Sequence, residues 1–167
     1  MNIKTSTLAP LSFTSVTVDG SFWKPRLDAN LKRTLAMQYE HCRRTGRLDA
    51  WNWKPGMPNE PHIYWDSDVG KWIEAVSYAL ACKRDRNKER KIDAIAGAMA
   101  RNQLKDGYLN SHFIKVEPAR RWTNLRDDHE LYCAGHLMEG AVAYYHATGK
   151  RNLLDILSKY ADCIEKT

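Results

Sequence analysis

The stretch RDDHELYCAGHLMEGAVAYY, residues 126–145, decides the fold of this chain. Its apolar residues recur every three to four positions, the period of a helix with one buried face. The stretch DSDVGKWIEAVSYALA, residues 66–81, begins about sixty residues earlier and also places acids before an apolar helical stripe. Because each stretch is followed by a short polar connection and a further helical pattern, the sequence predicts repeated helical hairpins.

The periodicity predicts five helical segments in all. They run from 23 to Gly46, from Ser67 or Asp68 to about 82, from about 88 to 106, from 128 to 146 with Thr148-Gly149 as its end, and from about 152 onward. The expected buried stripes contain Leu27, Leu31, Leu35, Tyr39, Val69, Trp72, Ile73, Val76, Ala79, Leu80, Ile92, Ile95, Ala96, Met99, Leu153, Leu154, Ile156, Leu157, Tyr160, Ala161 and Ile164.

The segments between the helices are of two kinds. Residues 1–22 are expected to form an extended lead-in or one short strand, and 49–66 and 107–126 are expected to be long aromatic loops. In a ring of paired helices, long loops gather at one end, where a pocket can form. The predicted fold class is therefore all-α: an incomplete α/α hairpin toroid of the (α/α)6-barrel type over residues 23–167. Because two and a half hairpins leave one side of such a ring unpaired, we expect the sequence to be the N-terminal part of a longer protein.

The composition argues against nucleic-acid binding, membrane spanning and secretion. The chain has 167 residues and a formal net charge of +6, and its densest charged run, 83–91, mixes both signs, so we expect no nucleic-acid partner. It has no run of eighteen apolar residues and no apolar leader, which argues against membrane spanning and secretion. Cys42, Cys82, Cys133 and Cys163 form no CxxC pair, so they are expected to be reduced, mostly buried thiols of a cytoplasmic protein.

The start of the 128–146 helix is the first candidate site. Asp127 or Asp128 is expected to cap the helix, because carboxylates there accept the free N–H groups. His129 gains nothing from the helix dipole and is expected to be neutral. It either hydrogen-bonds a ligand hydroxyl at the mouth of a pocket or is satisfied by its neighbours.

The stretch Trp65-Asp66-Ser67-Asp68 has the same design. One acid is expected to cap the helix and the other to bind ligand hydroxyls, since two positions in sequence do not set the carboxylate separation that glycoside acid/base chemistry requires. Tyr108, at the end of a helix, could reach the same pocket. The residues predicted to bind substrate are therefore His129, Asp66, Asp68, Trp65 and Tyr108, and no catalytic residue is assigned.

The 128–146 helix also presents a candidate metal-binding face. His129, Cys133 and His136 share one helix face, but the two histidines are two turns apart, about 10.5 Å along the axis, too far for an ion that binds its ligands at about 2.0–2.3 Å. His136 is better interpreted as a core histidine. We therefore expect no metal ligand and no cofactor in this segment.

Three segments carry a resemblance to a known family. WDSDVGKWIEAVSYAL, NQLKDGYLNS and HELYCAGHLMEGAVAYYHATGKRNLLDILSKYADCI resemble, in order and spacing, the N-terminal part of the beta-L-arabinofuranosidase family, glycoside hydrolase family 127. The resemblance runs from about Ser21 to the end of the chain. The HELYCAGH segment is its most specific part, whereas DGYL also occurs in other helical-ring glycosidases.

The resemblance implies an α/α six-hairpin barrel followed by β domains, and retaining release of beta-linked L-arabinofuranose. It implies a zinc-bound cysteine nucleophile and a glutamate acid/base in a later stretch that this chain does not contain, so zinc is expected only in the full-length protein. It further implies that His129 contacts the sugar and that Asp66 and Asp68 lie at the pocket rim. The chain alone is then expected to bind a carbohydrate without cleaving it.

The sequence is also compatible with two other functions. The same hairpins could form a helical-repeat binding or scaffold module, or a sugar isomerase or epimerase, since helical toroids host several activities. The unpaired hairpin edge could also lead to self-association.

Overall fold

The computed structural model describes residues 9–167, and every regular element in that range is helical. The elements are η1 Phe13–Ser15, α1 Trp23–Ala29, the π-helical η2 Asn30–Thr34, α2 Leu35–Arg44, η3 Arg47–Asn52, α3 Trp65–Cys82, α4 Arg86–Asn102, α5 Ser111–Lys115, η4 Pro118–Arg120, α6 Glu130–Thr148 and α7 Asn152–Glu165. The predicted all-α fold of paired helices is confirmed.

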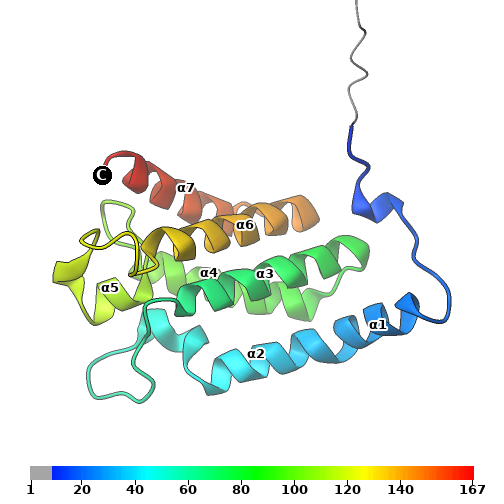
Figure 1. Cartoon of the computed structure of the whole chain (residues 1–167), viewed down its shortest axis with the longest axis horizontal. Helices are drawn as coiled ribbons and strands as arrows, with labels where there is room; N and C mark the ends of the chain where they lie inside the picture. The colour runs from blue at the N-terminus through cyan, green and yellow to red at the C-terminus, as the bar shows by residue number, and fades with distance from the viewer. Residues whose placement is uncertain (1–8) are drawn as a thin grey trace, which may run out of the picture.

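The hairpins stack side by side. In Figure 1, α3 and α6 run in the same direction next to each other, and α4 and α7 return along them. The segment α1–η2–α2 forms one long helix with a π turn inside it, and its α2 part lies against α3. The long loops gather at the end where α3 and α6 begin, while the short connections lie at the opposite end. Residues distant in sequence therefore converge around the N-termini of α3 and α6.

The core forms where the predicted apolar stripes meet. Every predicted core residue of α3 and α4 is buried, because a 3.6-residue period keeps such residues on one face. In α7 the buried position after Tyr160 is Cys163 rather than Ala161, which is exposed. Leu27 is also exposed, since α1 lies beyond the reach of the hairpins, whereas Leu35 is buried.

Several predicted helix ends were displaced. α3 starts at Trp65, so Asp66 and Asp68 lie inside its first turn, where the helix dipole favours acids, and neither caps it. α4 starts at Arg86 because Asp85 caps it by accepting from the N–H groups of Asn87 and Lys88. The predicted loop 107–126 contains a short helix, α5, capped by the side chain of Asn110.

The cap predicted for α6 was wrong. Neither Asp127 nor Asp128 caps it: His129 stands at the N-cap in a left-handed conformation, φ 58° and ψ 17°, with no side-chain cap. Asp128 instead accepts from Arg120 at 2.9 Å, and Asp127 from Arg126 and Asn124. Arginines of the preceding loop therefore pair with the two carboxylates that were predicted to cap the helix.

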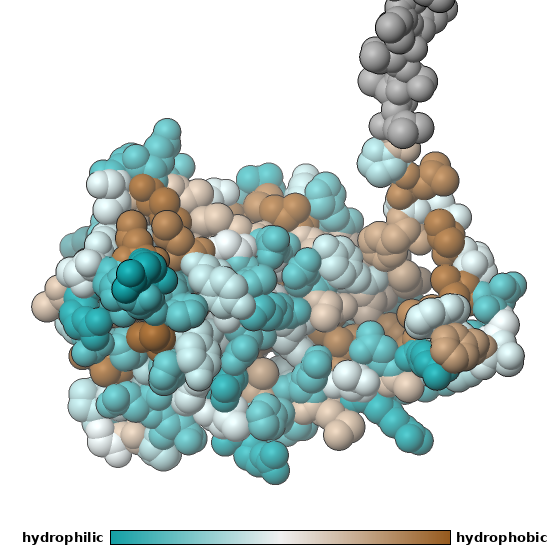
Figure 2. Space-filling view, viewed as in Figure 1, coloured by the Kyte–Doolittle hydropathy of each residue, from teal (hydrophilic) through white to brown (hydrophobic). Residues whose placement is uncertain are grey.

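The described part of the lead-in contains no strand. Residues 9–22 are irregular apart from the single turn of η1, which Ser12 caps, and Phe13 meets the edge of the Tyr78 ring at 5.5 Å. Hydrophobic side chains gather along this segment and the start of α1 in Figure 2, and those residues are exposed: Leu11, Phe13, Val16, Val18, Phe22 and Trp23. No helix within residues 9–167 is long and apolar enough to cross a membrane.

Candidate functional site

A pocket of about 520 Å³ lies where α3 and α6 begin. This volume falls in the range of roughly 300–1,000 Å³ that small-molecule sites occupy. Aromatic rings, charged groups and hydroxyl groups line it together, a mixture suited to a ligand with both hydroxyls and apolar edges. The lining residues are Tyr64, Ser67, Asp68, Lys71, Leu125, Arg126, His129 and Tyr132.

His129 lines this pocket between two tyrosines. Its ring meets Tyr64 at 6.0 Å and Tyr132 at 5.7 Å between centroids, both edge to face. Its Nδ1 lies 2.6 Å from the carbonyl oxygen of Asp127, so Nδ1 carries a proton and donates it. In the neutral ring Nε2 is then the acceptor, and no hydrogen bond within residues 9–167 uses it. His129 can therefore accept a hydrogen bond from a ligand hydroxyl.

Asp68 lies on the other wall of the pocket. Arg47 donates its Nε proton to the Asp68 carboxylate at 2.6 Å and also stacks over the half-buried Trp65 ring, with Cζ 4.9 Å from the centroid. The ion pair leaves Asp68 Oδ1 available to a ligand. Trp65 does not line the pocket; it contacts Arg47, which in turn pairs with Asp68.

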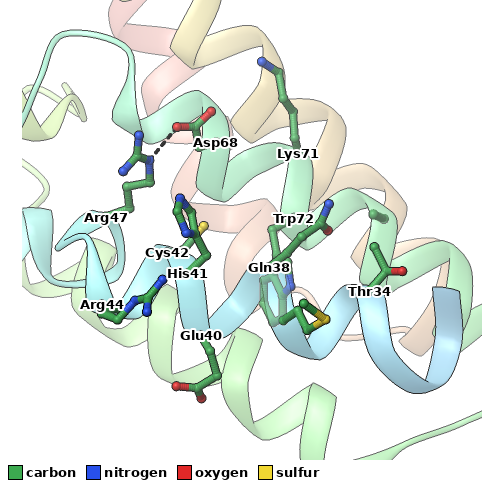
Figure 3. A pocket seen from close by; sticks show the side chains of 12 residues that line it. Thr34, Gln38, Glu40, His41, Cys42, Arg44, Arg47, Asp68, Lys71 and Trp72 are labelled. Carbon is green, nitrogen blue, oxygen red and sulfur yellow. Dashed lines mark hydrogen bonds and ion pairs between the residues drawn. The ribbon is translucent and has the colours of Figure 1, made fainter. Parts of the chain in front are cut away.

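Asp68 and Lys71 also border a larger hollow of about 1,220 Å³ between α2 and α3. Figure 3 shows Arg47 and Asp68 facing each other at its rim, with His41 and Cys42 contributed by α2. The floor contains Trp72, whose indole N–H donates to the carbonyl oxygen of Leu35 at 2.9 Å. The two hollows are therefore neighbours that share one wall.

Lys71 and Tyr132 join the two helices across the pocket. The Lys71 ammonium donates to the Tyr132 hydroxyl at 2.6 Å and lies 4.8 Å from the centre of that ring. The tyrosine hydroxyl is thereby oriented to donate its own proton away from the lysine. The pocket thus presents donors from Lys71 and Tyr132 and acceptors from Asp68 and His129.

Asp66 and Tyr108 are buried beneath the pocket and do not line it. Asp66 is 1% exposed and accepts from the backbone N–H of Ser111 at 2.7 Å and from its hydroxyl at 2.5 Å. Burial raises the pKa of the Asp66 carboxyl to about 6, against the opposing effect of the Ser111 hydrogen bonds. Tyr108 is fully buried, and its hydroxyl donates to Glu130. In this structure both side chains hold segments together rather than face a ligand.

Three carboxylates hold the loop that carries His129: Glu130 and Asp128 are buried, and Asp106 is exposed. Glu130 accepts from the backbone N–H of Trp122 at 2.8 Å as well as from Tyr108. Asp128 pairs with Arg120, and Asp106 pairs with Arg121, each at 2.9 Å. These ties fix the chain directly before α6 and so fix the left-handed turn at His129.

The helix face that carries His129, Cys133 and His136 does not form a metal site. The Cys133 thiol points into the core and donates to the carbonyl oxygen of Ile63 at 3.3 Å, and burial raises its pKa. His136 faces Glu139 instead, with 3.0 Å between Nδ1 and Oε2, and is partly exposed rather than a core histidine.

The zinc–cysteine centre implied by the resemblance does not fit the residues present. The four free cysteines lie on four different helices. Within residues 9–167, the one group of three possible metal ligands is Glu74, His136 and Glu139, which contains no thiol, and residues 1–8 contain no Cys, His, Asp or Glu. No chemical step through zinc is derived for this chain.

Of the predicted ligand-binding residues, the structure brings His129 and Asp68 together at the pocket. Sequence reasoning missed the other six lining residues, which are Tyr64, Ser67, Lys71, Leu125, Arg126 and Tyr132. A signal for two of them existed, because Lys71 follows Asp68 and Tyr132 follows His129 by three positions, which places each pair on one helix face.

Comparisons with known proteins agree with this fold. A family described as "Beta-L-arabinofuranosidase, GH127 catalytic domain" matches residues 15–167. A curated protein, the "Non-reducing end beta-L-arabinofuranosidase" of Bifidobacterium longum subsp. longum, is 37% identical over 107 residues, which cover 62% of this chain and 16% of that protein.

Two solved structures are similar over most of the chain. A GH127 beta-L-arabinofuranosidase from Geobacillus stearothermophilus T6 has a TM-score of 0.84 and 41% identity, covering 90% of this chain and 25% of that one. A second GH127 beta-arabinofuranosidase has a TM-score of 0.86 and 37% identity, covering 94% and 27%. The matched part of the chain thus spans about a quarter or less of each relative. On the family match and the fold together, this chain belongs to the beta-L-arabinofuranosidase family, glycoside hydrolase family 127.

Proposed function

We propose that this chain forms the sugar-binding wall of a glycoside hydrolase that acts on beta-L-arabinofuranosides. The three relatives described above carry names that specify beta-arabinofuranosidase activity, and this chain matches only a fraction of each. The hydrolytic activity of the whole protein is therefore part of the proposal, and a zinc-containing centre would come from residues outside this chain.

One observation carries the proposal: the acceptor nitrogen of His129 and the free oxygen of Asp68 line the same pocket between Tyr64 and Tyr132. A furanose offers several hydroxyl groups around a small apolar ring. Convergent polar groups with aromatic walls match that pattern. In this proposal Asp66 and Tyr108 support the pocket from below, and Trp65 acts through Arg47.

The chain by itself is proposed to bind sugar without cleaving it. A cysteine nucleophile reacts as a thiolate and needs a lowered pKa. Burial instead raises the pKa of the thiols of Cys42, Cys133 and Cys163. An aryl arabinofuranoside should therefore show no zinc-dependent turnover with these 167 residues. Measurable release would place bond cleavage in this chain and contradict the proposed division of roles.

The binding role is tested by titration of the chain with methyl beta-L-arabinofuranoside, followed by ligand-observed NMR. We expect His129→Ala to weaken binding by roughly three- to tenfold, the effect of losing one neutral hydrogen bond. His146→Ala is the matched control, because His146 lies on the same helix but outside this pocket. Equal affinity of wild type and His129→Ala, or equal binding of glucose, would count against the proposal.

A further inference from the structure

A second cluster of side chains joins α3 and α6 away from the sugar pocket. Glu74 of α3 and His136 and Glu139 of α6 each place one possible ligand atom within 4.8 Å of the others. His136 lies seven residues beyond His129, about 10 Å farther along the helix axis. The Glu74, His136 and Glu139 cluster has no role in the sugar site described above.

The Nδ1 atom of His136 has no suitable partner in this cluster. It is shielded from solvent and makes no hydrogen bond within residues 9–167. The Oε2 atom of Glu139 lies only 3.0 Å away, but the two atoms do not meet in hydrogen-bond geometry. Leaving a buried polar atom unpaired costs on the order of 1–3 kcal/mol. A cation that takes the ring nitrogen's lone pair removes that cost.

The charges of the cluster also favour a bound cation. Glu74 and Glu139 have no lysine or arginine within 4.0 Å in the described chain, and the one basic group near either is His136. Tyr78 donates its hydroxyl proton to Oε1 of Glu74 at 2.9 Å, which leaves Oε2 available. Two carboxylates around an acceptor nitrogen form a site for positive charge rather than a set of mutually satisfied side chains.

A path for an ion also exists. Glu74 and Glu139 line an open hollow of about 820 Å³ between the second halves of α3 and α6. Ligands bound to one ion at about 2.1 Å lie at most about 4.2 Å apart, so the cluster must contract slightly. The Glu139 side chain is 59% exposed and can rotate to allow this.

We propose that Glu74, His136 and Glu139 bind a divalent metal cation, with water in the remaining coordination positions. One imidazole nitrogen and two carboxylate oxygens, without a thiol, suit ions such as Mn²⁺ or Zn²⁺. The ion would link α3 to α6 at a point separate from the sugar pocket.

The probe is Mn²⁺, because it prefers oxygen and nitrogen ligands and so avoids the four cysteines. Electron paramagnetic resonance counts the free Mn²⁺ during titration of the chain. We expect one site per chain, at least tenfold weaker binding in Glu74→Gln and in Glu139→Gln, and unchanged binding in His146→Ala, since His146 lines the same hollow outside the cluster.

A second readout separates loss of the site from loss of the fold. Mn²⁺ should raise the thermal unfolding midpoint of the wild type and of His146→Ala, because ligand binding stabilises the folded state. It should leave the midpoint of Glu139→Gln unchanged. No binding to the folded wild type at millimolar Mn²⁺, or equal binding by wild type and both glutamine variants, would overturn the proposal.

Discussion

Gly70 of α3 lies directly against the backbone of His136 in α6. A Cβ atom at Gly70 would stand 2.7 Å from both the carbonyl carbon and the oxygen of His136, and one at Gly140 would stand 2.9 Å from the carbonyl oxygen of Gly70. Only glycine allows two helix backbones to approach this closely. The same approach brings Asp68 and His129, at the beginnings of the two helices, into one pocket.

Gly70→Ala should therefore strongly destabilise the fold. The new methyl group would meet backbone atoms, which cannot rotate away, and overpacking of this kind costs roughly 1–3 kcal/mol or more. Urea unfolding measures the effect. Gly135→Ala is the matched control, because nothing lies within 4 Å of its Cβ position and alanine favours the helix by roughly 0.5–1 kcal/mol. Equal stability of the two variants would show that the helices can move apart without cost.

The stability of the protein should depend on the charge of Asp66. Burial raises the folded-state pKa of this carboxyl to about 6 from 3.8, so the folded protein holds an extra proton between these pH values. The contribution of Asp66 is thus most favourable below about pH 4 and is lost as the pH rises through 6.

Asp66→Asn removes this titration, and its amide oxygen can accept from the Ser111 backbone N–H while its NH2 group donates to the Ser111 hydroxyl oxygen. The unfolding free energy of wild type relative to Asp66→Asn should fall by up to about 3 kcal/mol between pH 4 and pH 7. Denaturant unfolding at several pH values measures the difference. A difference that stays constant across this range would show that the Asp66 carboxyl titrates normally.

Tyr108→Phe should loosen the loop before α6. The variant keeps the ring but leaves the buried Glu130 carboxylate without one of its donors, at a cost of roughly 1.5–3 kcal/mol for a bond to a charged group. Tyr145→Phe serves as the control, because Tyr145 is partly exposed and its hydroxyl makes no hydrogen bond in the described chain. Hydrogen exchange of residues 116–129 should accelerate in Tyr108→Phe alone.

The four cysteines should differ sharply in reactivity. Cys82 is exposed, whereas Cys42, Cys133 and Cys163 are buried, and burial raises the pKa of these three thiols. Since the thiolate is the reactive form, the buried three should react with iodoacetamide at least about tenfold more slowly than Cys82. Mass spectrometry of peptides from the native protein resolves each site. Comparable labelling of Cys133 would point to an activated thiol in this chain.

The sequence alone determined the hairpins, because a helix with one buried face follows from apolar spacing within a single segment. The buried stripes of α3 and α4, and the end of α6 at Gly149, could each be predicted from the residues of that segment alone. The family could likewise be recognised from three short motifs, because a motif is defined by the order and spacing of residues in the sequence.

Tertiary structure decided which polar groups face the pocket. Asp66 and Asp68 are only two positions apart in sequence. Asp66 is buried and hydrogen-bonded to Ser111, whereas Asp68 forms an ion pair with Arg47 at the pocket rim. Tyr108 is likewise directed inward by Glu130, and Tyr132 is turned toward His129 by Lys71. Each of these partners comes from a different part of the chain, so spacing along the sequence could not select among them.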